Sequence, residues 1–122
     1  MNTLPKSERL KGKAAVSALL SKGRWGFTRG LKYCYIIDGT EEDSPRQARI
    51  LVSVPKKLFK RAVKRNLLKR RLRESYRTQK DLLQGCPADI MFIYNTGEVM
   101  DFGTIREQVA SILTRINDER QL

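Results

Sequence analysis

The chain has 122 residues and a formal net charge of +12, from 25 lysines and arginines against 13 aspartates and glutamates, and it contains no histidine. This length suits one domain with its own core, and the apolar fraction of 40% argues against disorder. The missing histidine excludes histidine-based catalysis and metal binding, and two separated cysteines make no zinc site. Because no apolar run is long enough for a membrane span or a signal peptide, we expect a cytoplasmic protein without a membrane partner.

The first half of the chain predicts a helix followed by three strands. The predicted elements are a helix over Lys13–Ser21 and strands over Arg24–Arg29, Leu31–Asp38 and Arg46–Val54. Gly23 marks the end of the helix, and Pro55, which cannot donate a hydrogen bond to a neighbouring strand, ends the last strand. Because residues 39–45 have the composition of a turn, we interpret the second and third strands as an antiparallel hairpin.

The second half of the chain predicts two helices on either side of one strand. Phe59–Gln84 contains no glycine or proline and is rich in leucine, lysine and arginine, so it predicts one long helix. An apolar strand is expected over Asp89–Tyr94, and a last helix is expected from Asp101 or Thr104 to Asn117. The order α-β-β-β-α-β-α predicts an α+β fold in which helices pack on a single sheet, with one domain over residues 1–122.

Positive charge is concentrated in Lys56–Lys80, where twelve residues are basic and only Glu74 is acidic. Helical spacing gives this segment an apolar face and a cationic face. The apolar face consists of Leu68, Leu72, Tyr76 and Leu83, and the cationic face consists of Asn66, Lys69, Arg70, Arg73, Arg77 and Lys80. Solvated helix faces usually mix both signs of charge, so this concentration favours a nucleic-acid partner over an acidic protein, a membrane surface or no partner.

The segment Val54–Arg77 closely resembles the signature of the bacterial ribonuclease P protein subunit. The matching residues are Lys56, Lys57, Arg65, Asn66, Lys69, Arg70, Arg73, Glu74 and Tyr76. A weaker resemblance covers the rest of the chain. It implies an accessory subunit that helps a catalytic RNA remove the 5′ leader from precursor tRNA. It also implies an α-β sandwich with a left-handed β-α-β crossover, against the right-handed rule.

The resemblance and the basic segment together predict the residues that contact RNA. These are Lys56, Lys57, Arg61, Arg65, Asn66, Lys69, Arg70, Arg73 and Arg77. The resemblance also implies a cleft for the single-stranded leader between the first helix and the sheet, with Val16, Leu20, Tyr35 and Ser53 on its wall. It further implies that the RNA subunit is catalytic, that the RNA and the substrate hold most of the Mg²⁺, and that the protein has no catalytic or metal-binding residues. We expect the free protein to be monomeric.

The sequence departs from the family pattern at three positions. Val16 and Leu20 stand where the family commonly has phenylalanine, and Leu67 stands where it often has arginine, a charge for which Arg71 could compensate. Trp25 and Phe27 could contribute to the cleft, but we interpret them as ordinary packing residues.

The sequence leaves one other function open and argues against a second. A structural RNA-binding protein of the ribosome or of the RNA-chaperone type is the alternative, because only the spacing of residues 65–74 separates it from the first interpretation. A stand-alone nuclease is disfavoured, because the acidic residues are dispersed apart from a cluster in the turn at 41–43.

Overall fold

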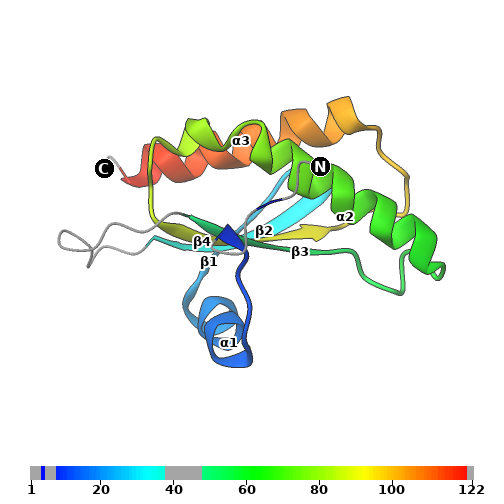
Figure 1. Ribbon diagram of the computed structural model, residues 1–122, viewed down its shortest axis with the longest axis horizontal. Helices are drawn as coiled ribbons and strands as arrows, with labels where there is room; N and C mark the ends of the chain where they lie inside the picture. Colours follow the sequence, from blue (N-terminus) through cyan, green and yellow to red (C-terminus); the bar gives the residue numbers. More distant parts are fainter. Residues whose placement is uncertain (1–3, 5–7, 38–47, 121–122) are drawn as a thin grey trace.

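A computed structural model describes residue 4 and residues 8–37 and 48–120 of the chain. The helices and strands are α1 (Lys13–Lys22), β1 (Arg24–Phe27), β2 (Leu31–Ile37), β3 (Arg49–Ser53), α2 (Ala62–Arg77), the short 3-10 helix η2 (Lys80–Leu83), β4 (Ala88–Tyr94) and α3 (Phe102–Arg120). Figure 1 shows that α2 and α3 cover one face of the sheet and that α1 lies against the other face. The predicted α+β class and the order of the elements are confirmed.

The strand order β1-β2-β4-β3 places β4 at the centre of the sheet. β4 pairs antiparallel with β2, for example Tyr35 with Ile90, and parallel with β3, where Ile50 lies opposite the same Ile90. The predicted hairpin of β2 with β3 is therefore wrong, and its turn at 39–45 lies outside the described residues. Alternation shows that a strand buries one face, but it does not show which strand lies beside it. The left-handed sense of the β3-α2-β4 crossover stays a prediction.

The long helix predicted over Phe59–Gln84 is shorter in the structure, because α2 ends at Arg77. The hydroxyl of Thr78 donates to the carbonyl of Glu74, and the backbone N–H of Gln79 bonds to the carbonyl of Tyr76 in the tighter 3-10 pattern. The chain continues as η2. This short helix ends at Gln84, whose backbone has the left-handed conformation. The basic segment therefore changes direction before Lys80, so the cationic face does not continue to that residue as one helical surface.

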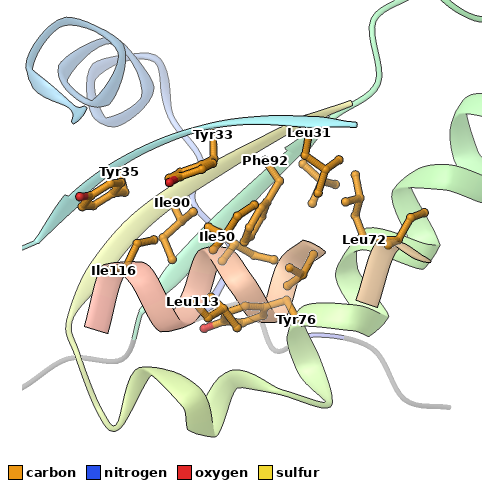
Figure 2. Packing of buried hydrophobic residues seen from close by; sticks show 14 of the residues in the cluster. Leu31, Tyr33, Tyr35, Ile50, Leu72, Tyr76, Ile90, Phe92, Leu113 and Ile116 are labelled. Atoms are coloured by element: carbon orange, nitrogen blue, oxygen red, sulfur yellow. The ribbon is translucent and has the colours of Figure 1, made fainter. Parts of the chain in front are cut away.

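The main core lies between the sheet and the layer formed by α2 and α3 (Figure 2). The apolar face predicted for α2 is confirmed, because Leu68, Leu72 and Tyr76 are fully or almost fully buried. On β4 the alternate residues Ile90 and Phe92 face this core. Burial of this face fixes the orientation of α2 about its own axis, so the opposite face must point to solvent.

A smaller core lies on the other side of the sheet, under α1. It consists of Leu10, Leu19 and Cys34, with Ala15, Ile36, Leu51 and Met91 packed against it. The segment before α1 is tied to the edge of β3, because the N–H of Leu10 bonds to the carbonyl of Ile50. This segment connects the α1 layer with the α2 layer, since buried Glu8 pairs with Lys80 just beyond α2.

The burial of Tyr76 in the main core can be tested by measuring how the free energy of unfolding depends on pH. Burial raises the pKa of its phenol, and the negative charge of Glu8 adds to this effect. Above about pH 10 the unfolded chain loses this proton while the folded chain keeps it, so the free energy of unfolding should fall by about 1.4 kcal/mol per pH unit from this group. Urea denaturation of the wild type and of Tyr76→Phe between about pH 9 and pH 11 measures the effect. The wild type should lose more stability than the variant, and parallel losses would contradict the prediction.

Candidate nucleic-acid interface

The outward side of α2 presents three cations without a carboxylate partner. Lys69, Arg70 and Arg73 lie on the helix face opposite Leu68 and Leu72, and no acidic side chain of the described residues forms an ion pair with any of the three. Asn66 is exposed on the same side, one helical turn before them. The backbone that carries these side chains is fixed, because the other face of the helix is packed in the core, so the cations project from a defined face of α2.

The N-terminal end of α2 extends this surface. Lys56, Lys57 and Arg61 are exposed in the connection between β3 and α2. Phe59 anchors the connection, because its ring packs edge-on against Tyr94 with 5.6 Å between the ring centroids. The first turn of α2 carries no acidic residue, so the positive end of the helix dipole adds to the field of the lysines and arginines.

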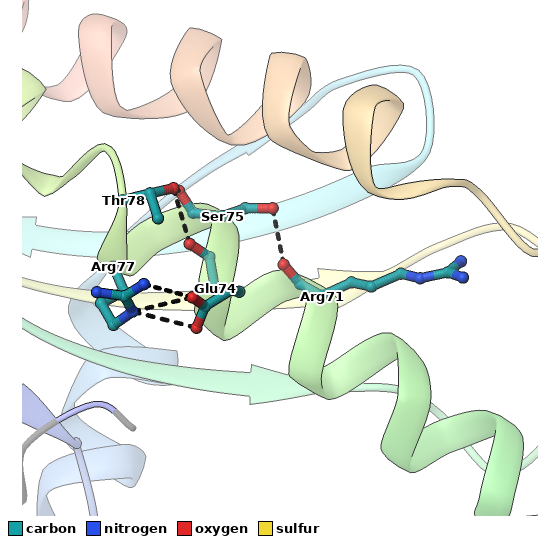
Figure 3. A network of polar contacts seen from close by, with 5 residues as sticks. All are labelled: Arg71, Glu74, Ser75, Arg77 and Thr78. Carbon is teal, nitrogen blue, oxygen red and sulfur yellow. Dashed lines mark hydrogen bonds and ion pairs between the residues drawn. The ribbon is translucent and has the colours of Figure 1, made fainter. Parts of the chain in front are cut away.

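Two members of the cationic face have carboxylate partners. Arg77 donates from Nε to Glu74 at 3.0 Å (Figure 3), and this hydrogen bond lowers the pKa of Glu74 and raises the pKa of Arg77. Lys80 places Nζ 2.9 Å from a carboxylate oxygen of Glu8. These partners compensate part of the charge, so Arg77 and Lys80 offer less net attraction for a phosphate than the three unpaired cations do.

Two further arginines of α2 hold neighbouring backbone. Arg65 donates from Nη1 to the carbonyls of Phe59 and Lys60, both at 2.8 Å, and so shapes the connection before the helix. Arg71 is half-buried and donates to the carbonyl of Met100 at 2.6 Å, which joins α2 to the segment before α3. The structure therefore gives Arg71 a structural role and does not support the suggestion that it compensates for Leu67.

Arg9 is a further cation of this region, and the sequence does not indicate that it belongs there. It is exposed beside β3, where it pairs with Ile50, and its positive charge lowers the pKa of Arg73 after the larger effect of partial burial. The repulsion indicates that Arg9 adds to the field of the cationic face from a different part of the chain. No signal in the sequence links the two positions, because their proximity depends on the position of the N-terminal segment along β3.

A groove of about 950 Å³ lies beside α1 and brings together two of the four residues predicted for the leader cleft. Its walls include Val16, Leu20 and Leu51, with Lys11 and Lys13 also lining it. Ser53, the third predicted residue, follows Leu51 by two positions on β3 and so lies on the same face of the sheet.

The placement of Tyr35 on the wall of this cleft is wrong. Tyr35 is 7% exposed and stacks against Tyr33 in the main core, on the side of β2 that faces α3 (Figure 2). The residue of β2 that faces α1 is the adjacent Cys34, whose buried thiol donates to the carbonyl of Leu19. A shift of one residue along a strand moves a side chain to the other face of the sheet, which is the reason for the error.

The prediction that Trp25 and Phe27 are packing residues is also wrong. Their side chains are 43% and 59% exposed on β1, although both residues belong to the sheet.

No helix among the described residues is both long enough and apolar enough to cross a membrane. Within the same residues, no three cysteine, aspartate or glutamate side chains gather in a way that could hold a metal ion. The arrangement is suited to binding phosphates through fixed cations.

Comparisons with known proteins agree on one family. A family model described as Ribonuclease P matches residues 4–117. The chain belongs to the ribonuclease P protein component family. The protein component from Porphyromonas gingivalis is 36% identical over 93% of this chain and 85% of its own length. The one from Chlorobaculum tepidum is 44% identical over 67% of this chain and 54% of its own length.

Solved structures of ribonuclease P proteins share this fold. The Staphylococcus aureus protein has a TM-score of 0.74 and 25% sequence identity over 91% of this chain and 96% of its own. The Thermotoga maritima protein also has a TM-score of 0.74 and 25% identity, over 88% of this chain and 96% of its own. As a ribonuclease P protein component, the chain is part of a ribonucleoprotein endoribonuclease of tRNA processing, which implies an RNA partner. This membership decides against the alternative of a ribosomal or chaperone-type protein.

Arg70 and Arg71 are adjacent in the sequence, but truncating the first should reduce RNA affinity and truncating the second should reduce stability. Arg70→Ala should weaken binding of the RNA partner about five- to tenfold and leave stability unchanged, because its guanidinium has no carboxylate partner in the described part of the chain. Arg71→Ala should lower the free energy of unfolding by about 1–3 kcal/mol, because it removes a charged donor from the carbonyl of Met100.

An RNA-binding titration and urea denaturation of both variants measure the two effects. The two variants remove the same charge, so net charge is matched between them. Equal losses of RNA affinity would show that only total charge matters and that the orientation of α2 does not.

Proposed function

We propose that this ribonuclease P protein component binds the catalytic RNA subunit through α2 and the connection before it. The proposal rests on one observation: Lys69, Arg70 and Arg73 have no carboxylate partner among the described residues. They project from the outward side of a helix whose inward face is buried. Like charges held this close repel one another, and RNA phosphates relieve that repulsion when they bind. Exposed Lys56, Lys57 and Arg61, together with Arg65 and Asn66, extend the proposed contact to the start of α2.

We also propose that the groove beside α1 receives part of the 5′ leader of precursor tRNA. The aliphatic side chains of Val16, Leu20 and Leu51 give the groove an apolar wall, and Lys11 and Lys13 can attract phosphates at its border. Aliphatic side chains contact bases without the stacking that aromatic rings provide, so this groove should discriminate weakly among leader bases. Ser53 supplies a hydroxyl on the same sheet face.

The chemistry of cleavage is assigned to the RNA subunit in this proposal. Cleavage by the protein itself would need a nucleophile with its base, or carboxylates that hold metal ions, and the described residues offer neither arrangement. The two acidic side chains that contact residues of the cationic face, Glu8 and Glu74, form ion pairs with Lys80 and Arg77. Mg²⁺ would therefore be held mainly by the RNA and the substrate, while the cations of this chain bind and orient phosphates.

Two further expectations concern the oligomeric state of the protein and its location in the cell. We expect the free protein to be monomeric and to act in the cytoplasm on precursor tRNA. Sedimentation of the free chain measures its oligomeric state.

Binding of the catalytic RNA should depend steeply on salt. If the cationic face neutralises about four phosphates, the logarithm of the affinity should fall against the logarithm of the salt concentration with a slope of about −3 to −4. Arg73→Ala should make the slope shallower by about one, because one phosphate contact is lost. Binding titrations at several salt concentrations give both slopes, and a flat response of the wild type would refute binding through this surface.

Cleavage of precursor tRNA should require the RNA subunit. Purified protein alone should leave the substrate intact, and addition of the cognate catalytic RNA with Mg²⁺ should give removal of the leader. Gel analysis of the products, at low salt and with mature tRNA as a control substrate, checks both statements. Multiple-turnover cleavage by protein freed of RNA with nuclease would contradict the assignment of catalysis to the RNA.

A further inference from the structure

Two exposed aromatic rings and one lysine form a cluster at the edge of the sheet. Trp25 lies opposite Cys34, and Phe27 lies opposite Lys32, in the antiparallel pairing of β1 with β2. Directly opposed residues share a face, and Cys34 is buried beneath α1, so both rings lie on the face of the sheet that carries α1. The ammonium of Lys32 lies 4.7 Å from the centroid of the Trp25 ring and 5.7 Å from that of Phe27.

Gly26 explains why both rings point away from the main core. A Cβ atom at this position would lie 2.4 Å from the phenolic oxygen of Tyr33, which is too close for any side chain. The Tyr33 ring thus fills the space on the core side of β1 beside Gly26, so this side of the strand has no room for a side chain at position 26. The residues before and after it, Trp25 and Phe27, place their side chains on the opposite side of the strand. The sequence Trp-Gly-Phe therefore fixes two aromatic rings on the solvent side of this edge strand.

The cluster opens onto a row of the sheet that α1 does not cover. The buried contacts of α1 with the sheet go to Cys34, Ile36, Leu51 and Met91. The next row along the strands, which we call the open row, consists of Phe27, Lys32, Ile93 and Ser53. It crosses all four strands, and none of its members belongs to the cluster of side chains that packs beneath α1. Figure 1 shows α1 below the sheet and α2 and α3 above it, so α1 is the one helix of the described residues that lies on this face.

We propose that Trp25 and Phe27 form a stacking platform for the bases of single-stranded RNA, with Lys32 binding an adjacent phosphate. Aromatic rings of this kind receive bases of any sequence on their faces, and an ammonium beside them meets the backbone that joins the bases. The flexible side chain of Lys32 can turn from the rings to a phosphate while the rings stay fixed on β1. The aliphatic groove beside α1 cannot stack bases, and among the described residues of this sheet face only Trp25 and Phe27 carry exposed aromatic rings.

The choice of RNA over a protein partner follows from charge. The rings flank an ammonium on a chain with a net charge of +12, and this combination is complementary to a strand that carries a phosphate at every base. The inference rests on the proposed function, which supplies an unpaired strand in the leader of precursor tRNA. It goes further by placing base contacts on β1, outside the groove that Val16 and Leu20 line.

Trp25 is the only tryptophan of the chain, so its fluorescence reports directly on this site. Titration of the full-length protein with an unstructured oligoadenylate of about ten nucleotides should quench the emission, because a stacked base contacts the indole ring. Inorganic polyphosphate of the same total charge should bind without comparable quenching. Equal quenching by the two polyanions, or unchanged emission with the oligoadenylate, would overturn the platform, and the second result would direct the search to a protein partner.

A matched pair of variants tests the platform independently of fluorescence. Phe27→Ala should weaken oligoadenylate binding about tenfold, because one stacked base is lost. Phe102→Ala truncates another exposed aromatic residue, 38% exposed at the start of α3, and should leave this affinity unchanged. Anisotropy of a labelled oligoadenylate gives the affinities, and thermal melting shows that both variants are folded.

Failure of the platform can be told apart from failure of the proposed function. If Phe27→Ala binds the oligoadenylate as the wild type does while Arg70→Ala still weakens binding of the catalytic RNA, the platform is refuted and the proposed function stands. If the wild type binds neither RNA, both are refuted.

Discussion

The burial of Leu68, Leu72 and Tyr76 against the central strand is the constraint on which the rest of the structure depends. These side chains fix both the position of α2 on the sheet and its rotation about its own axis. Hydrophobic burial has no direction of its own, but an amphipathic helix that buries one face must expose the opposite one. The cationic face owes its direction to this packing, because the backbone that carries its residues is fixed by the buried side chains of the opposite face.

The cations of α2 and its surroundings divide into two groups by what their side chains contact. Arg71 binds a backbone carbonyl, and Arg77 and Lys80 bind carboxylates, so these three stabilise the protein itself. Arg65 belongs to both groups, because its Nη1 binds backbone carbonyls and it is also part of the proposed RNA contact. Lys69, Arg70 and Arg73 have no such partner among the described residues. A basic helix therefore uses one part of its charge for its own fold and keeps the other part available for RNA. The sequence alone does not distinguish the two groups, because Arg70 and Arg71 are neighbours of identical type.

The elements and the faces of α2 could be predicted because they depend on local spacing. Helical periodicity predicted the buried residues Leu68, Leu72 and Tyr76 of α2, and the composition of the strands predicted where most of them lie. What could not be predicted depends on contacts between distant segments. The neighbour of β3 is β4 and not β2, the side of the sheet that receives α1 is the one with Cys34 and not Tyr35, and Arg9 meets Arg73 across the edge of β3. The exposure of Trp25 and Phe27 belongs to the same class, because it depends on Tyr33 filling the space beside Gly26.

The central place of β4 has a consequence for the order in which the protein acquires its structure. β4 is the last strand in the sequence, yet it alone joins β2 to β3. Until β4 has been synthesised, β2 and β3 lack the strand that pairs with both of them, and α2 lacks the central strand on which it packs. Contacts between such distant segments close slowly, and apolar surface stays exposed until they form. The surface proposed to bind RNA therefore becomes a defined surface only late in synthesis, after most of the chain that carries it has already been made.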